Sequence, residues 1–176
     1  MYFKFENIKL LPIEEHHLIE IQQWINDENL TKYMTVHFPV SFMEQKSWLE
    51  KLYKDESKIK LIISVDDKDV GMISLINIDH KNKNSEIGIY IIPKYQKNKY
   101  AFKVINKMLN FVFREMNMHK IYVLIYKCNV PSIKLFEKLG FTFEGSDRES
   151  VFYNNKYHDI NRYSIFKRDF LDENNI

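Results

Sequence analysis

Residues 87–126 decide the fold, and they read IGIYIIPKYQKNKYAFKVINKMLNFVFREMNMHKIYVLIY. Their first six residues are almost all apolar, as expected of a strand covered on both faces. Beyond Pro93, apolar residues recur every three or four positions from Ala101 to Met116, which predicts one amphipathic helix. A second apolar run, Ile121–Tyr126, predicts another strand. Two strands joined by a crossover helix in this way are expected to be parallel.

Further elements extend this unit in both directions along the chain. Ser41 and Glu44 form a capping box that starts a helix, and Asn129 and Gly140 are typical of the two ends of another. Asn154-Asn155 suits a tight hairpin turn. The remaining predicted elements are a helix over residues 15–27 and strands over residues 8–11, 59–65, 70–78, 141–152 and 156–167.

These elements predict an α/β (α+β) fold. We expect a central mixed, twisted sheet of about six or seven strands with helices on both faces. Residues 1–171 are expected to form a single domain, and residues 172–176 a disordered tail.

The composition narrows the class of protein. The chain has 176 residues, of which 45% are hydrophobic, and a net charge of +2, which argues against binding to nucleic acid or to a membrane surface. The single cysteine, Cys128, excludes an internal disulfide and provides no metal cluster. The N-terminus carries neither a signal peptide nor a long apolar run. We therefore expect a cytoplasmic protein without a metal.

Two segments of the chain are candidates for chemistry. The turn before the long helix exposes backbone N–H groups at a helix N-terminus, which binds phosphate readily. Four lysines surround it: Lys94, Lys97, Lys99 and Lys103. The alternative is an ordinary solvated turn. Asn129 and Ser132 follow a parallel strand, where ligands of α/β sheets sit, although taken alone they are better explained by simple helix capping, which needs no ligand.

Taken together, the two segments resemble a known family. The pattern Pro93-x-x-Gln96-x-x-x-x-Ala101, followed by Asn129-x-x-Ser132-x-x-x-Phe136-x-Lys138-x-Gly140-Phe141, is similar to the GNAT acetyltransferases. Within them the chain looks most like the branch of ribosomal-protein N-terminal and bacterial spermidine or diamine acetyltransferases. Ser85-Glu86-Ile87-Gly88-Ile89 and Lys156-Tyr157-x-Asp159 follow the same branch. The likeness covers roughly residues 8–170.

The resemblance implies an acetyl-CoA-dependent N-acetyltransferase in which two parallel strands splay apart around the cofactor. Acetyl-CoA is then a co-substrate, with its pantetheine on the first strand and its pyrophosphate on the loop. The implied cofactor-binding residues are Tyr90, Ile91, Ile92, Gln96, Lys97, Asn98, Lys99, Tyr100, Ala101, Asn129, Ser132, Phe136 and Lys138. The amine attacks the thioester directly, which agrees with the lack of a Ser/His/Asp or Cys/His arrangement in the sequence.

Two residues depart from the family pattern. Lys99 stands where the loop usually has glycine, and we expect it to keep a negative φ and to add charge for the phosphate. Phe136 replaces a tyrosine whose hydroxyl protonates the departing thiolate, so that water or another side chain must supply this proton or the role is dispensable. Both residues favour the alternative of a catalytically weak acyl-CoA-binding or regulatory domain.

The expected catalytic residue is Glu86, which could deprotonate the ammonium through water. The alternative for Glu86 is a surface carboxylate, and Tyr33, Tyr126 and His119 are weaker candidates for the base. Cys128 is interpreted as a small residue at the end of a strand.

The acceptor is expected to be a primary amine. A group of acidic residues would suit a cationic polyamine or diamine, although charges on helix faces are usually only solvated. These residues are Glu14, Glu15, Asp27, Glu28 and Glu44. A protein N-terminal amine would need a groove, and an amino sugar would need stacking aromatics such as Tyr33, Phe38 and Trp48. An exposed sheet edge is consistent with a homodimer.

Overall fold

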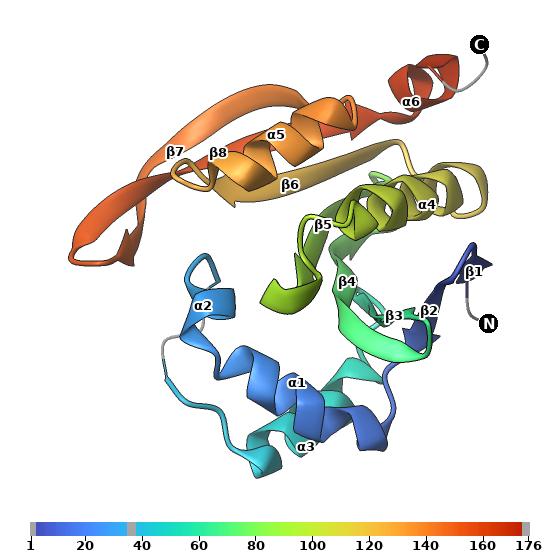
Figure 1. Cartoon of the computed structure of the whole chain (residues 1–176). Helices are drawn as coiled ribbons and strands as arrows, with labels where there is room; N and C mark the ends of the chain where they lie inside the picture. Colours follow the sequence, from blue (N-terminus) through green and yellow to red (C-terminus); the bar gives the residue numbers. More distant parts are fainter. Residues whose placement is uncertain (1–2, 35–37, 174–176) are drawn as a thin grey trace. The chain divides into compact units, whose positions relative to one another are not determined.

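In the computed structural model, which describes residues 3–34 and 38–173, eight strands form one mixed sheet in the order β1-β2-β3-β4-β5-β6-β8-β7 (Figure 1). The strands are β1 (Phe3–Phe5), β2 (Ile8–Pro12), β3 (Ile59–Val65), β4 (Lys68–Asp79), β5 (Asn84–Ile91), β6 (Lys120–Tyr126), β7 (Thr142–Tyr153) and β8 (Lys156–Phe166). The helices are η1 (Glu15–His17), α1 (Leu18–Ile25), α2 (Glu28–Thr31), α3 (Phe42–Leu52), η2 (Pro93–Tyr95), α4 (Tyr100–Arg114), α5 (Val130–Lys138) and α6 (Lys167–Glu173).

The predicted α/β class is confirmed, but the predicted number of strands is wrong. The additional strand is β1, which pairs with β2 in antiparallel register. It has only three residues, too few for an alternating pattern to stand out in the sequence. Its turn also lacks the usual glycine, since Glu6 takes the left-handed conformation with φ 50°.

The chain divides into two compact units, to both of which β4 and β5 contribute residues. The first unit comprises residues 1–75 and 89–101, of which the structure describes those from Phe3 on, except residues 35–37. Within it, α1 and α3 contact each other (Figure 1). Its buried core contains Ile13, Leu18, Ile21, Trp24, Leu49, Ile62, Met72 and Ile92.

The helices of the first unit start and end at identifiable residues. The predicted capping box is confirmed, since the Ser41 hydroxyl accepts from the Glu44 N–H while the Glu44 carboxylate accepts from the Ser41 N–H. The predicted helix over residues 15–27 is instead split into η1 and α1. The change from η1 to α1 comes between His17 and Leu18, and α1 ends at Ile25. Beyond it, the Asp27 carboxylate caps α2 by accepting from the Asn29 N–H.

The second unit comprises residues 76–88 and 102–176, described up to Glu173. Its strands β5 and β6 are parallel, as predicted, with Glu86 opposite Tyr122. The pairing of β6 with β8 is antiparallel and extends from Lys120 to Tyr126. The long helix buries Val104, Ile105, Met108, Leu109, Val112 and Phe113, all from the predicted apolar stripe.

The ends of α5 and of the β7–β8 hairpin also follow the sequence. Asn129 caps α5, and Gly140 follows it with φ 84°, in the left-handed region. Asn154 and Asn155 form the hairpin turn with φ values of 50° and 58°. Helix α6 ends at Glu173, so the first two residues of the expected tail are helical, and residues 174–176 lie outside the described residues.

Candidate functional site

The expected phosphate loop, residues 96–101, lies in the first unit and is held by its own side chains. The Gln96 side-chain amide donates to the Ile91 carbonyl at 2.8 Å, which ties the loop to the end of β5. The Asn98 side-chain amide donates to the Tyr95 carbonyl at 3.2 Å. Residues 96–99 are all exposed. The loop is therefore shaped by amides, while its lysines remain accessible to an anion.

The backbone of this loop corrects one expectation. Lys99 has φ 60° rather than a negative value, and Lys97 has φ 66°. Both lysines thus occupy the left-handed region, which costs an L-residue roughly 1–2 kcal/mol and which glycine enters freely. The loop keeps the path that glycine normally permits because the Gln96 and Asn98 amides fix it. Turns of this kind are one source of anion-binding N–H groups.

The strand leading into the loop is approached closely by its neighbour in the sheet, β4. Gly71 lies against the Tyr90 carbonyl, and a Cβ atom on Gly71 would be 2.1 Å from that oxygen. The Tyr90 ring meets Trp24 edge-on, with 6.1 Å between ring centroids, and burial raises the pKa of its phenol far above the ordinary value. The Tyr90 side chain is therefore a neutral packing element, and the backbone of this strand is what remains for a ligand.

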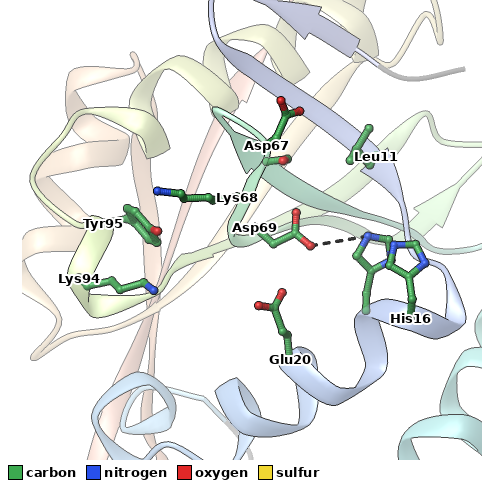
Figure 2. Close-up of a pocket in the computed structure, with 10 residues that line it drawn as sticks. Leu11, His16, Glu20, Asp67, Lys68, Asp69, Lys94 and Tyr95 are labelled. Atoms are coloured by element: carbon green, nitrogen blue, oxygen red, sulfur yellow. Dashed lines mark ion pairs between the residues drawn. The ribbon is translucent and has the colours of Figure 1, made fainter.

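A cavity of about 610 Å³ opens elsewhere in the first unit (Figure 2). It is lined by Leu11, His16, His17, Glu20, Ser64, Asp67, Lys68, Asp69, Lys94 and Tyr95. His17 is buried, with Nδ1 accepting from the Glu14 N–H and Nε2 3.7 Å from an Asp69 oxygen. The expected cofactor residues do not line this cavity. In the sequence this cavity is marked only by two adjacent histidines and an acidic turn about fifty residues further on. Nothing in the sequence alone indicates that these two segments lie together.

The second unit carries the other expected cofactor-binding residues. The Asn129 side-chain oxygen accepts from the Ser132 N–H at 3.3 Å, so the capping interpretation is observed directly. The Phe136 side chain is only 1% exposed and meets Phe141 edge-on, with 5.0 Å between centroids. The Lys138 ammonium lies 5.4 Å from the Phe102 ring centroid. The structure brings Asn129 and Ser132 together, whereas Phe136 and Lys138 pack against other aromatic rings.

Glu86, the expected base, sits in a polar setting within the second unit. It is half-buried, and burial raises the pKa of its carboxyl. Two contacts oppose this rise: the Asn77 side-chain amide donates to Glu86 Oε2 at 3.3 Å, and the Arg162 charge favours the carboxylate. The Arg162 guanidinium lies 4.1 Å over the Tyr122 ring. Sequence analysis did not identify Asn77 and Arg162, because only the arrangement of the strands in the sheet places them near Glu86.

The weaker candidates for the base have local roles. Tyr126 is buried, and burial together with the nearby Cys128 raises the pKa of its phenol. His119 is exposed, with its ring edge-on to Phe166 at 5.4 Å. The Lys32 ammonium lies over the Tyr33 ring, 5.2 Å from the ring centroid. Cys128 is a free, exposed thiol at the rim of a second cavity of about 290 Å³.

The acidic residues expected near an acceptor are mostly engaged locally. Glu15 pairs with Lys46 at 2.9 Å, and Asp27 and Glu44 cap helices. The Glu14 backbone carbonyl accepts from the His17 N–H, a bond that does not involve its carboxylate. Glu28 is exposed in the first turn of α2. This local use supports the solvation alternative for most of the group.

Among the described residues there is no helix whose length and hydrophobicity would suffice to span a membrane. Within residues 3–34 and 38–173, His, Cys, Asp and Glu side chains form no group of three or more that could hold a metal ion.

The chain is similar to known N-acetyltransferases in sequence. The profile of the acetyltransferase (GNAT) domain matches residues 7–142. The chain is 28% identical over 167 residues to spermidine N(1)-acetyltransferase of Escherichia coli K12, covering 95% of the chain and 90% of that protein. It is 31% identical over 170 residues to an SPbeta prophage-derived uncharacterized N-acetyltransferase, YokL, of Bacillus subtilis, covering 96% and 95%.

Solved structures agree with these relatives. Spermidine N-acetyltransferase from Vibrio cholerae in complex with CoA and spermine has a TM-score of 0.88 at 28% identity, covering 94% of the chain and 98% of that structure. A dodecameric structure of the same enzyme in an intermediate state has a TM-score of 0.84 at 26% identity, covering 95% and 98%.

Proposed function

Because the chain belongs to the acetyltransferase (GNAT) domain family, we propose that it transfers the acetyl group of acetyl-CoA to a primary amine of a polyamine such as spermidine. It is an acetyl-CoA-dependent N-acetyltransferase. The observation that carries the choice of substrate is likeness over nearly the whole chain to spermidine N-acetyltransferases, in sequence and in structure. The exposed Glu28 in α2 supports a cationic acceptor.

The cofactor-binding residues are proposed unit by unit. In the first unit, the backbone of Tyr90–Ile92 would pair with the pantetheine, and residues 96–101 would hold the pyrophosphate. The exposed loop and its left-handed lysines support this role. In the second unit, the first turn of α5, with Asn129 and Ser132, would offer helix N–H groups to the cofactor. Phe136 and Lys138 would contribute packing rather than hydrogen bonds to it.

The proposed chemistry is a direct transfer. Glu86 would take a proton from the ammonium through water, and the free amine nitrogen would then attack the thioester carbonyl. The tetrahedral intermediate would lose the extra proton of its nitrogen to water and expel the CoA thiolate, so that the N–C bond of the amide replaces the S–C bond. Phe136 has no proton to give, so water would relay the proton from the nitrogen to the thiolate. A thiol pKa of about 8–9 makes this leaving group tolerable without a strong acid.

The test is an amine panel with free CoA thiol as the readout. Purified protein is incubated with acetyl-CoA and spermidine, spermine, a diamine, a peptide with a free N-terminus or an amino sugar. We expect thiol release to be fastest with the polyamines, and mass spectrometry to detect one added acetyl group. Faster release with the peptide would contradict the polyamine assignment. Thermal stabilisation by CoA without turnover on any amine would favour the catalytically weak binding domain instead.

The homodimer and the cytoplasmic location stay predictions. The Vibrio cholerae enzyme has a dodecameric structure, so self-association of this chain is a reasonable proposal. Sedimentation velocity with and without spermidine distinguishes a dimer from a larger assembly.

A further inference from the structure

Four strands contribute side chains to a cluster at Glu86 within the second unit. Asn77 comes from β4, Glu86 from β5, Tyr122 from β6 and Arg162 from β8, and Glu144 from β7 is influenced by Arg162. We call Asn77, Glu86, Tyr122 and Arg162 the Glu86 cluster. Glu86 is half-buried, whereas isolated surface carboxylates are mostly exposed and make no fixed contacts. The arrangement around this carboxylate therefore requires an explanation beyond solubility.

Asn77 holds an unusual backbone conformation that aims its side chain. It lies inside β4 with φ 53°, although strand residues normally have negative φ. Asparagine is one of the few residues that enter the left-handed region readily. Its amide donates to Glu86 Oε2 at 3.3 Å. The irregular backbone and the hydrogen bond occur at the same residue, which points to a role in fixing the carboxylate.

Arg162 supplies a positive charge whose position is fixed by stacking. Its guanidinium lies 4.1 Å over the Tyr122 ring, and Tyr122 is the residue paired with Glu86 across β5 and β6. The other charged groups nearby are already partnered, since Lys120 forms an ion pair with Glu144 at 2.6 Å. Arg162 is therefore the cation of the described residues that bears on Glu86, and it also lowers the pKa of Glu144.

We propose that Asn77 and Arg162 are positioning residues for the acetyl transfer: Asn77 orients the Glu86 carboxylate, and the stacked Arg162 stabilises its charged form. The inference rests on the proposed role of Glu86 as the base. Burial of Glu86 by itself favours the protonated acid, which cannot accept the proton of the ammonium. The two contacts oppose that effect in part, so that more of the half-buried carboxyl stays ionised and able to act as a base.

The sign of the pH effect follows from these contacts. Arg162 and Asn77 both lower the pKa of Glu86, so removing either one raises it further. At a given acidic pH a smaller fraction of Glu86 is then ionised. The acid limb of the profile of kcat/KM against pH should therefore move to higher pH. At high pH, where Glu86 is ionised in every variant, the difference in rate should shrink.

The test uses paired variants in the full chain with spermidine as the acceptor. Asn77→Gly removes the amide but accepts the left-handed backbone, and Asn77→Asp keeps the shape but places a like charge beside Glu86. Arg162→Gln removes the charge, whereas Arg162→Lys keeps it without the planar stacking group. We expect Asn77→Asp and Arg162→Gln to lose about 10-fold or more of kcat/KM on the acid limb, the effect of one hydrogen bond to a charged group. In Arg162→Lys the acid limb should stay close to its pH in the parent protein.

Arg148→Gln serves as the matched control, because Arg148 is exposed on β7 and its charge acts on Asp159 instead. This variant should leave the acid limb in place. Thermal melting of every variant checks that the fold is intact. The inference would be overturned if the acid limbs of Asn77→Asp and Arg162→Gln lay at the same pH as that of Arg148→Gln.

Glu86→Gln separates this inference from the proposed function. If Glu86→Gln loses about 10²–10⁴-fold, as removal of a general base does, the base is established whatever the positioning variants show. If Glu86→Gln keeps full activity on spermidine, the base assignment and the positioning roles both fail, while the acetyltransferase activity stands.

Discussion

The phosphate loop of the first unit and helix α5 of the second unit are both proposed to bind the cofactor, but they use the left-handed backbone differently. In the loop, Lys97 and Lys99 have positive φ. At the end of α5, Gly140 takes the same region after a regular helix with an Asn129 cap. In this pair of segments, glycine takes the left-handed region where α5 ends, and lysine takes it where an anion is expected. Scarcity of glycine in a loop does not remove a left-handed turn, and here the turn also gains charge.

The largest effect is expected at Gly71, where β4 approaches the strand that leads into the loop. Gly71→Ala would place a Cβ atom 2.1 Å from the Tyr90 carbonyl, and backbone cannot yield as a flexible side chain does. We expect the free energy of unfolding to fall by about 3 kcal/mol or more, at the upper end of overpacking effects. Urea denaturation measures it.

Gly145→Ala is the matched control for this variant, since a Cβ atom on Gly145 of the second unit would contact nothing within 4 Å. Its unfolding free energy should stay within about 0.5 kcal/mol of the parent. Equal losses in the two variants would mean that the close approach at Tyr90 is not what matters.

The next effect is expected at the end of α5. Gly140→Ala puts a Cβ on a residue with φ 84°, which costs roughly 1–2 kcal/mol. The measurement is the midpoint of urea unfolding. Gly140→Asn should recover part of the loss, because asparagine tolerates this region. A neutral Gly140→Ala would show that the second unit accepts left-handed strain as easily as the loop does, and the contrast between the two segments would disappear.

A smaller loss is expected at the start of the same helix. Asn129→Ala removes the oxygen that accepts from the Ser132 N–H, which costs about 1 kcal/mol for a typical N-cap. Asn129→Asp should restore the cap. If both variants bind CoA as the parent does in calorimetry, Asn129 is a cap only, and its cofactor role is wrong.

The smallest effect on stability is expected in the loop itself. Lys99→Gly relieves the left-handed strain but frees the unfolded chain, and the two contributions of about 1 kcal/mol nearly cancel. CoA affinity should nevertheless fall a few-fold, because a charge near the phosphate is lost, and the difference should shrink at high salt. Lys99→Ala keeps the strain without the charge and is the control. Tighter CoA binding by Lys99→Gly would show that the lysine only hinders the loop.

Local signals in the sequence predicted most of the fold, whereas contacts that depend on strand register could not be predicted from it. The apolar stripe of α4, the Ser41 capping box, the Asn154-Asn155 turn and the parallel pair were all predictable, because each depends on residues close in sequence or on a fixed handedness rule. The sign of φ at Lys99 was not, since the amides of Gln96 and Asn98 override its backbone preference.

The surroundings of Glu86 could not be predicted for a different reason. Arg162 is brought near this carboxylate only by the pairing of β8 with β6. Asn77 is itself the irregular residue inside β4, and its left-handed backbone directs its amide to Glu86. A change of one residue in strand register would turn either side chain to the opposite face. The same holds for His17 and Asp69, which are far apart in sequence and meet at the first cavity.

The exposed lysines of the phosphate loop have a consequence for proteolysis. Trypsin cleaves after lysine in accessible, irregular segments, and Lys97 and Lys99 lie in such a segment between η2 and α4. A loop built from glycine would offer the protease no side chain to recognise. Cleavage here would divide the chain into fragments of about 97–99 and 77–79 residues, and a bound phosphate group would shield the site. Limited digestion thus becomes a direct gauge of cofactor occupancy, readable on a gel without any catalytic turnover.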